Sequence, residues 1–144
     1  MRSWKPLKSV ISPVRAVVDT SFWIDAWRGD LDEAEKHRIA ELWRHGGGVL
    51  PQIVWLELLV GLRSPEERAH LMDLKAVSQW EPLSEADGMA AEKLAALLRK
   101  KGVVLAASDL LVLTVAHRLG LPLLHHDEDF TRALKLPDFA PQRD

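Results

Sequence analysis

The sequence lacks cysteine, a long apolar segment and a surplus of positive charge, and each absence excludes a class of protein. Without cysteine, neither a disulfide framework nor a thiolate zinc site can form, and nothing indicates an oxidising compartment. No apolar stretch approaches the ~20 residues that span a bilayer, and residues 1–15 carry charges and prolines where a signal peptide requires an apolar segment. We therefore expect a cytoplasmic protein with no membrane partner.

The formal net charge of −2 gives no indication of nucleic-acid binding, because domains that bind nucleic acid usually carry a basic surplus. Any contact with RNA must then be local or mediated by a metal ion. Apolar residues make up 47% and charged residues 28% of the 144 positions, which is the balance of an ordinary globular protein. A chain of this length can bury a core without disulfide or metal cross-links.

Two regions are expected along the chain. Residues 1–14 contain Pro6 and Pro13 and show no clean periodicity, so we interpret them as a tail or a loosely docked arm. Residues 15–144 contain one series of short apolar segments and helices with no internal repeat, and we expect them to form a single domain.

Short apolar strands alternate with helices through this second region. Apolar runs at residues 15–18, 49–50 and 122–124 favour strands, and residues 78–83 are a further candidate strand. Helices are expected after a cap at Thr20 or Ser21, from Asp32 to Arg44, from Pro51 through Leu62, and after caps at Ser64, Ser84 and Ser108. Because parallel neighbouring strands require crossover connections, this alternation predicts an α/β fold with a mostly parallel central sheet and helices on both faces.

Four acidic residues are candidates for a functional site because of their positions in the sequence. Asp19 and Asp127 each follow directly on an apolar strand, and the carboxyl ends of parallel strands form a crevice in which sites are commonly found. Glu57 lies within the segment IVWLELLVGL among apolar neighbours, and burying it unpaired would cost several kcal/mol. Asp109 opens an apolar helix, where an acid equally serves to satisfy free N–H groups.

Carboxylates gathered in such a crevice repel one another and raise each other's pKa unless a cation is present. Oxygen ligands without cysteine or a histidine-rich set favour Mg²⁺, with Mn²⁺ as a substitute, over zinc. Ions of this kind bridge to phosphate groups. The pattern therefore predicts hydrolysis of a phosphodiester bond that leaves a 5′-phosphate and a 3′-hydroxyl.

Three segments together carry a family resemblance: VVDTSFWID at residues 17–25, WLELLVGLR at 55–63 and SDLLVLTVAHRLGLPLLHHDEDF at 108–130. In order and spacing they resemble PIN domains of the VapC toxin type. The resemblance implies a PIN-like three-layer α/β/α fold and a metal-dependent endoribonuclease that acts on single-stranded RNA, usually as a homodimer. It also implies silencing by a VapB-like antitoxin whose tail blocks the acidic pocket.

The same resemblance assigns roles to residues of this chain. The catalytic metal ligands would be Asp19, Glu57, Asp109 and Asp127, with auxiliary roles for Thr20, Ser21 and Asp129. The chain departs from many relatives in its extension before the first strand and at His125, where a threonine or serine is common. His125 is either a group that contacts phosphate or water or, more commonly for a loop histidine, an ordinary solvated or hydrogen-bonded side chain.

The six tryptophans invite a role in stacking against RNA bases. Trp23, Trp27 and Trp43 lie on predicted helices at core spacing, so we expect them in the core or in an interface. This leaves Trp4 and Trp80 as freer candidates for stacking.

Three other functions remain open at this point. A PIN-fold RNA-processing nuclease without an antitoxin would share every motif, and a catalytically inactive PIN-fold binding module would share the fold. A phospho-accepting receiver domain also gathers acids at strand ends. It requires a lysine on a late strand, however, and none is evident near Leu123.

Overall fold

A computed structural model describes residues 14–139 of the chain, which contain one four-stranded sheet. The strands are β1 (Ala16–Val18), β2 (Gly48–Pro51), β3 (Gln79–Glu81) and β4 (Leu123–Leu124), in the order β3-β2-β1-β4. All three neighbouring pairs are parallel. Apart from Val14, the expected N-terminal tail or arm lies outside the described residues, as does Trp4.

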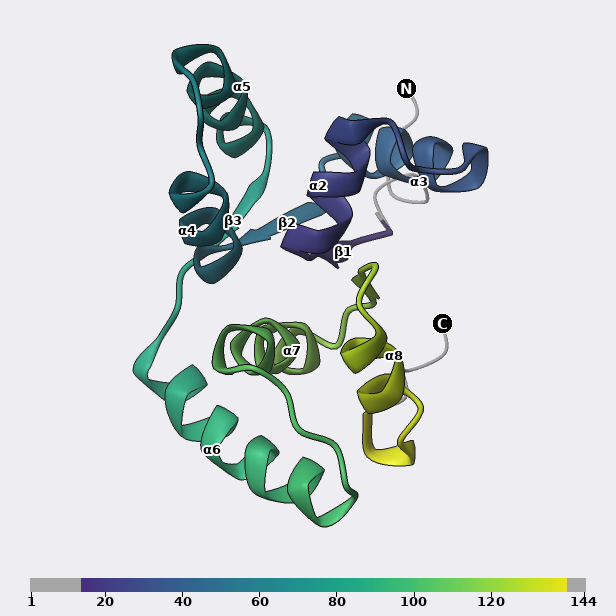
Figure 1. Cartoon of the computed structure of the whole chain (residues 1–144), viewed down its shortest axis with the longest axis vertical. Coiled ribbons are helices and arrows are strands. Elements are labelled where there is room, and N and C mark those ends of the chain that lie inside the picture. Colours follow the sequence, from purple (N-terminus) through teal and green to yellow (C-terminus); the bar gives the residue numbers. More distant parts are fainter. Residues whose placement is uncertain (1–13, 140–144) are drawn as a thin grey trace, which may run out of the picture.

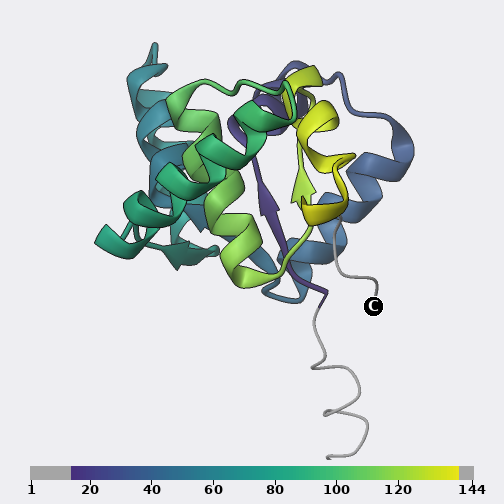
Figure 2. The same ribbon diagram turned by 90° about the horizontal axis from the view of Figure 1, so that it is seen from below.

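Helices cover both faces of this sheet. On one side lie α2 (Thr20–Arg28) and α3 (Glu33–Arg44), and on the other lie α6 (Glu85–Lys100), α7 (Ala107–Leu119) and α8 (Glu128–Leu134) (Figure 1). Seen from below, β1 is visible between α7 and α8, and α6 lies alongside α7 (Figure 2). Helices α4 (Gln52–Val60) and α5 (Pro65–Ala76) lie near the β3 end of the sheet, and a short 3₁₀ helix, η1 (Pro137–Phe139), follows α8. The three-layer α/β/α architecture is therefore confirmed. Within residues 14–139, no helix has the length and apolarity needed to cross a bilayer.

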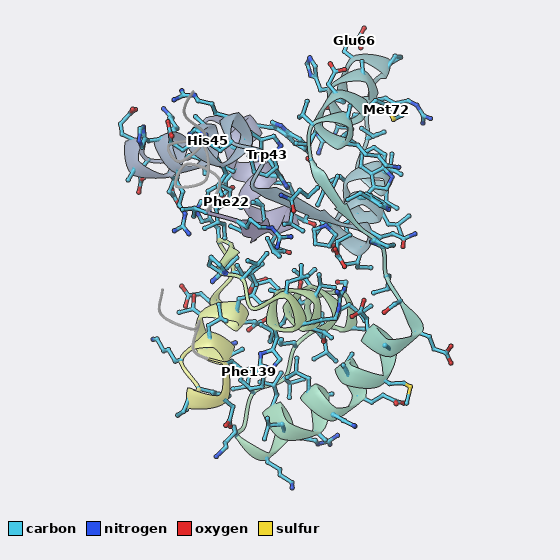
Figure 3. The ribbon with its side chains drawn as sticks, turned by 180° about the vertical axis from the view of Figure 1, so that it is seen from behind. Phe22, Trp43, His45, Glu66, Met72 and Phe139 are labelled. Carbon is cyan, nitrogen blue, oxygen red and sulfur yellow. The ribbon has the colours of Figure 1, made fainter. Side chains whose placement is uncertain are left out.

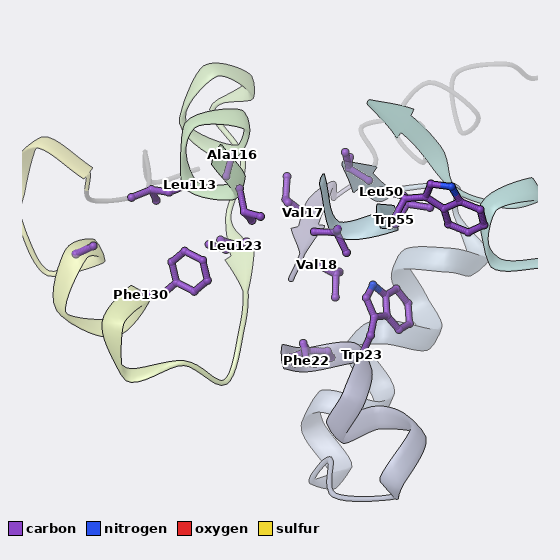
Figure 4. Close-up of a cluster of buried hydrophobic side chains, with 14 of the residues drawn as sticks. Val17, Val18, Phe22, Trp23, Leu50, Trp55, Leu113, Ala116, Leu123 and Phe130 are labelled. Atoms are coloured by element: carbon purple, nitrogen blue, oxygen red, sulfur yellow. The ribbon is translucent and has the colours of Figure 1, made fainter. Parts of the chain in front are cut away.

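The core forms on the two faces of β1, whose three residues are all fully buried. Val17 faces α7, α8 and β4, whereas Val18 faces α2, because successive side chains of a strand point to opposite faces (Figure 4). Leu113, Ala116, Leu123 and Phe130 pack on the Val17 side of the strand, and Phe22 and Trp23 pack on the Val18 side. Burying each aliphatic side chain contributes roughly 1.5–3 kcal/mol, so the strand that carries the first acid is held firmly.

Three helix starts differ from the sequence-based expectation. The cap of α2 is Asp19 rather than Thr20 or Ser21, because its carboxylate accepts the Ser21 N–H and it has extended backbone angles. Pro51 ends β2 and precedes α4 instead of lying in its first turn. Helix α7 begins at Ala107 after Ala106, with no side-chain cap in the described part of the chain, so the expected Ser108 cap is wrong.

The caps predicted at Ser64 and Ser84 are confirmed, and Asp32 is a further cap that was not predicted as one from the sequence. Helix α3 begins after Asp32, which forms a reciprocal capping box with Glu35. Helix α6 begins after Ser84, which forms the same arrangement with Asp87. Each box satisfies two backbone N–H groups that would otherwise lack a partner at the start of the helix.

The burial and packing of the tryptophans differ in part from the expectation. Trp23 is buried and packs edge-on against Trp43, with ring centroids 4.9 Å apart, on the side of the molecule where Figure 3 shows Trp43 and Phe22. Trp27 is 54% exposed and so lies outside the core, while a place in an interface stays a prediction for it. Trp80 packs edge-on against Trp55, and the Lys75 ammonium lies 4.3 Å from its ring centroid. Trp80 is therefore a packing residue and not a free stacking platform.

Candidate active site

Asp19 is positioned by both strand and helix, since it directly follows β1 and caps α2. Its Oδ2 accepts hydrogen bonds from the Ser21 N–H at 3.0 Å and from the Ser21 hydroxyl at 2.6 Å. Its Oδ1 is buried and has no hydrogen-bond partner among residues 14–139. A buried polar atom without a partner costs roughly 1–3 kcal/mol, so this oxygen is suited to accept a ligand.

A second group of acids lies at the same edge of the molecule. Asp109 stands in the first turn of α7, Asp127 caps α8 after β4, and Asp129 lies in the first turn of α8. One carboxylate oxygen from each of the three lies within 4.8 Å of the others. The Asp129 N–H donates to Asp127 Oδ1 at 2.8 Å, which orients that carboxylate. Asp129, expected only as an auxiliary residue, thus belongs to the same close group as Asp109 and Asp127.

The electrostatics of Asp109 link these acids to Asp19 and Glu57. Partial burial, followed by repulsion from Asp19, Asp127, Glu57 and Asp129 in that order, raises the pKa of Asp109 to about 6. Since such repulsion acts over short distances, the structure brings all four predicted acids into one neighbourhood. Asp19 and Glu57 stand outside the tight group of three but remain within electrostatic reach of it.

Glu57 reaches this neighbourhood from α4 and is paired. Its Oε1 accepts a hydrogen bond from Thr20 Oγ1 at 2.9 Å, and the side chain is only partly buried. Helix α4 contacts both α2 and α7, which carry Thr20 and Asp109. Thr20 thus supplies Glu57 with a polar partner that is 37 positions away in the sequence, among otherwise apolar neighbours in the chain.

His125 has the ordinary structural environment of a hydrogen-bonded loop histidine. Its Nδ1 accepts the Asp127 N–H at 3.2 Å, and its ring packs edge-on against Phe130 with centroids 5.3 Å apart. Burial lowers the pKa of His125, although the Asp19 and Asp127 carboxylates oppose this effect. A neutral ring whose Nδ1 is the acceptor carries its proton on Nε2. Through its contact with the Asp127 N–H, His125 fixes the backbone of the segment that carries Asp127.

Sequence reasoning missed a second histidine, His126. Its ring lies between two carboxylates, with Nδ1 2.6 Å from Asp25 Oδ2 and Nε2 hydrogen-bonded to Glu35 Oε2. The partners are 101 and 91 residues away in the sequence. No local pattern brings such residues together, and the one signal in the sequence is that His126 directly precedes Asp127.

Comparison with known proteins places the chain in a family. The sequence pattern of the PIN domain family matches residues 16–136. No curated protein matches the chain. Two solved structures share its fold: DNA-bound VapBC from Salmonella typhimurium, and VapBC2 from Rickettsia felis bound to a DNA fragment from their promoter.

The Salmonella chain has a TM-score of 0.71 and 18% identity, and the match covers 83% of this chain and 92% of that one. The Rickettsia chain has a TM-score of 0.68 and 18% identity, with 85% and 93% covered. At this identity the likeness concerns the fold. Because the family pattern extends from β1 past the end of α8, this chain belongs to the PIN domain family.

Proposed function

We propose that this protein is a metal-dependent endoribonuclease that acts as the toxin of a VapBC-type toxin–antitoxin pair. The observation that carries the proposal is the convergence of five carboxylates, which raises the pKa of Asp109 to about 6 while leaving a buried oxygen of Asp19 without a partner. Such an arrangement is electrostatically unfavourable without a cation. Membership of the PIN family and the fold shared with two VapBC structures support the nuclease and toxin assignments.

The donor set fits a hard divalent cation. All the candidate ligands are carboxylate oxygens, which suit Mg²⁺ or Mn²⁺ better than zinc. Asp19 Oδ1, Asp109 and Asp127 would hold the ion, and Glu57 and Asp129 would contact it directly or through water. When bound, the cation supplies a more acidic coordinated water and offsets negative charge on the phosphate.

The side chains around the acids hold them in place for this chemistry. Ser21 occupies Asp19 Oδ2 through two hydrogen bonds, which directs Oδ1 away from the protein hydrogen-bond network. Thr20 occupies Glu57 Oε1, which leaves Oε2 to orient an attacking water or to accept its proton. Because these groups are ordered by the fold before substrate binds, little reorganisation is needed in the transition state.

The proposed partners follow from the same assignment. Single-stranded RNA would bring its phosphate to the acidic group through the cation, since the chain as a whole has a net charge of −2. A VapB-like antitoxin would silence the enzyme, and a second copy of the chain would complete a homodimer. The two VapBC structures support the antitoxin because their chains share this fold.

Cleavage of RNA by the purified protein tests the enzymatic part. We expect cuts in the presence of Mg²⁺ or Mn²⁺, no cuts in EDTA, and a loss of about 100-fold or more in Asp19→Asn. Asp73→Asn, which changes an exposed aspartate on α5, is the matched control and is expected to behave as wild type. Cleavage that survives both EDTA and Asp19→Asn would overturn the mechanism.

Growth of a bacterial host after induction tests the toxin part. Wild-type protein is expected to arrest growth, and Asp19→Asn is expected to permit it at equal expression. Protein that cleaves RNA in vitro but leaves growth unchanged would instead favour a processing nuclease without an antitoxin.

A further inference from the structure

The side chain of His126 joins three elements beside the acidic group. It belongs to the segment between β4 and α8, Asp25 belongs to α2, and Glu35 belongs to α3. The three side chains are 24%, 29% and 30% exposed, so the cluster is shielded from water on most of its surface. Hydrogen bonds to Glu35 and Asp25 raise the pKa of His126, which is consistent with donation from both ring nitrogens.

The backbone of the same histidine leads directly to the acids. The His126 N–H donates to Ser21 Oγ at 3.0 Å, and this hydroxyl in turn donates to Asp19 Oδ2 at 2.6 Å. The residue that follows His126 in the chain is Asp127. One residue is thus connected to both strand-end acids, to one through a hydroxyl and to the other through the peptide chain.

The partners of His126 are themselves held in place. Glu35 uses Oε1 to accept the Asp32 N–H in the capping box of α3, which leaves Oε2 for the histidine. Asp25 lies four residues after Ser21, so both contacts fall on one face of α2. The ring of Phe22, which is buried, lies 4.9 Å from the His126 ring. The histidine therefore docks against a prearranged surface of α2 and α3.

We propose that His126, held by Asp25 and Glu35, is a positioning residue that fixes the segment carrying Asp127 against the helix that Asp19 caps, so that the two acids are aligned to share one divalent cation. This inference rests on the proposed function, because it concerns the metal ligands of that same site. His126 acts through Ser21 and through the backbone, and it is not itself a ligand in this proposal.

The expected effect is a loss of metal affinity. Residues that orient metal ligands without contacting the metal themselves typically contribute 10–100-fold to the affinity for the metal. His126→Leu keeps the backbone N–H but removes both ring contacts, so we expect Mn²⁺ to bind about tenfold more weakly. Asp25→Asn combined with Glu35→Gln retains His126 and a capping-box residue at position 35, and we expect a weakening in the same direction.

The experiment measures the Kd for Mn²⁺ from the EPR signal of the free ion, in the absence of RNA, for wild type, both variants and His45→Leu. His45 lies at the end of α3, pairs with Glu41 at 3.3 Å and is exposed, so it provides a matched control (Figure 3). Thermal unfolding of the metal-free proteins distinguishes a variant that is less stable from one that is folded but positions the metal ligands poorly. A structural link alone would lower the melting temperature and leave the Kd of the folded protein unchanged.

The proposal is supported if both variants bind Mn²⁺ more weakly and His45→Leu does not. It is overturned if either variant, once shown to be folded, binds within twofold of wild type. If one variant does not fold, the other decides. Wild-type protein that binds Mn²⁺ but cleaves no RNA would contradict the proposed function while leaving the positioning role intact, and wild-type protein that binds no Mn²⁺ would overturn both.

Discussion

Replacing Asp109 with asparagine is expected to stabilise the metal-free protein, although it removes a proposed ligand. Folding places this carboxylate near four others and partly buries it, which raises its pKa from 3.8 to about 6. An acid whose pKa is higher in the folded state opposes folding wherever it is ionised. This cost is fully present above pH 6 and disappears as the pH falls through 6 toward 3.8. Asparagine removes the charge and hence the cost.

The size of this effect follows from the environment of Asp109. A rise in pKa from 3.8 to about 6 corresponds to about 3 kcal/mol, at 1.36 kcal/mol for each pKa unit. Asp109 is only partly buried, so screening by water is expected to remove about half of this energy. Asparagine also loses the favourable interaction of an acid with the first turn of α7, which is about 0.5 kcal/mol. The net gain in the free energy of unfolding is then about 1 kcal/mol at pH 7.5.

Urea unfolding in EDTA at pH 7.5 and at pH 4.5 measures this gain, with Asp73→Asn as the control. We expect Asp109→Asn to be more stable than wild type at pH 7.5, with a smaller difference at pH 4.5. Added Mn²⁺ should stabilise wild type more than the variant, because a ligand that binds only the folded state raises its stability. A variant less stable than wild type at pH 7.5, or a gain that is unchanged at pH 4.5, would refute the reasoning.

Two further predictions concern the fold around the site. Burial alone would raise the pKa of Asp87, but hydrogen bonds from Arg118 and the start of α6 lower it below 3.8. Asp87→Asn should therefore lower the free energy of unfolding by about 2 kcal/mol at pH 7. This loss should shrink as the pH falls below 3.8, because the wild-type carboxylate then becomes protonated. Equal losses in urea titrations at pH 7 and pH 3.5 would contradict the prediction. Gly48→Ala places a Cβ 2.4 Å from the Trp43 ring and should cost about 1–3 kcal/mol. Gly88→Ala, whose Cβ meets nothing within 4 Å, is the control, and equal melting temperatures for the two variants would rule out the clash.

The fold was predictable because its signals are local. Apolar strands alternating with helices indicate crossover connections, and these in turn require parallel neighbours. Asp19 and Asp127 could be placed for the same reason, since an acid that follows an apolar strand stands at the carboxyl edge of the sheet. The helix caps were less predictable. A run such as Asp-Thr-Ser offers three side chains that can each cap a helix, and tertiary position selects Asp19.

The contacts that arrange the site could not be predicted, because they join residues far apart in the sequence. Thr20 meets Glu57 across 37 positions, and His126 meets Asp25 across 101. Trp80 offered no sequence signal for its packing against Trp55, because both partners depend on where β3 meets α4. These pairings follow from the order of the strands in the sheet, which periodicity alone does not specify.

The central claim is that the acids at this edge of the sheet bind a divalent cation. Anomalous diffraction from crystals grown with Mn²⁺ tests it most directly, because the peak reports the position of the metal without reference to activity. We predict a peak in direct contact with Asp109, Asp127 and the free Oδ1 of Asp19, and no such peak in Asp19→Asn. Wild-type crystals in saturating Mn²⁺ that show no peak against these carboxylates would contradict the account.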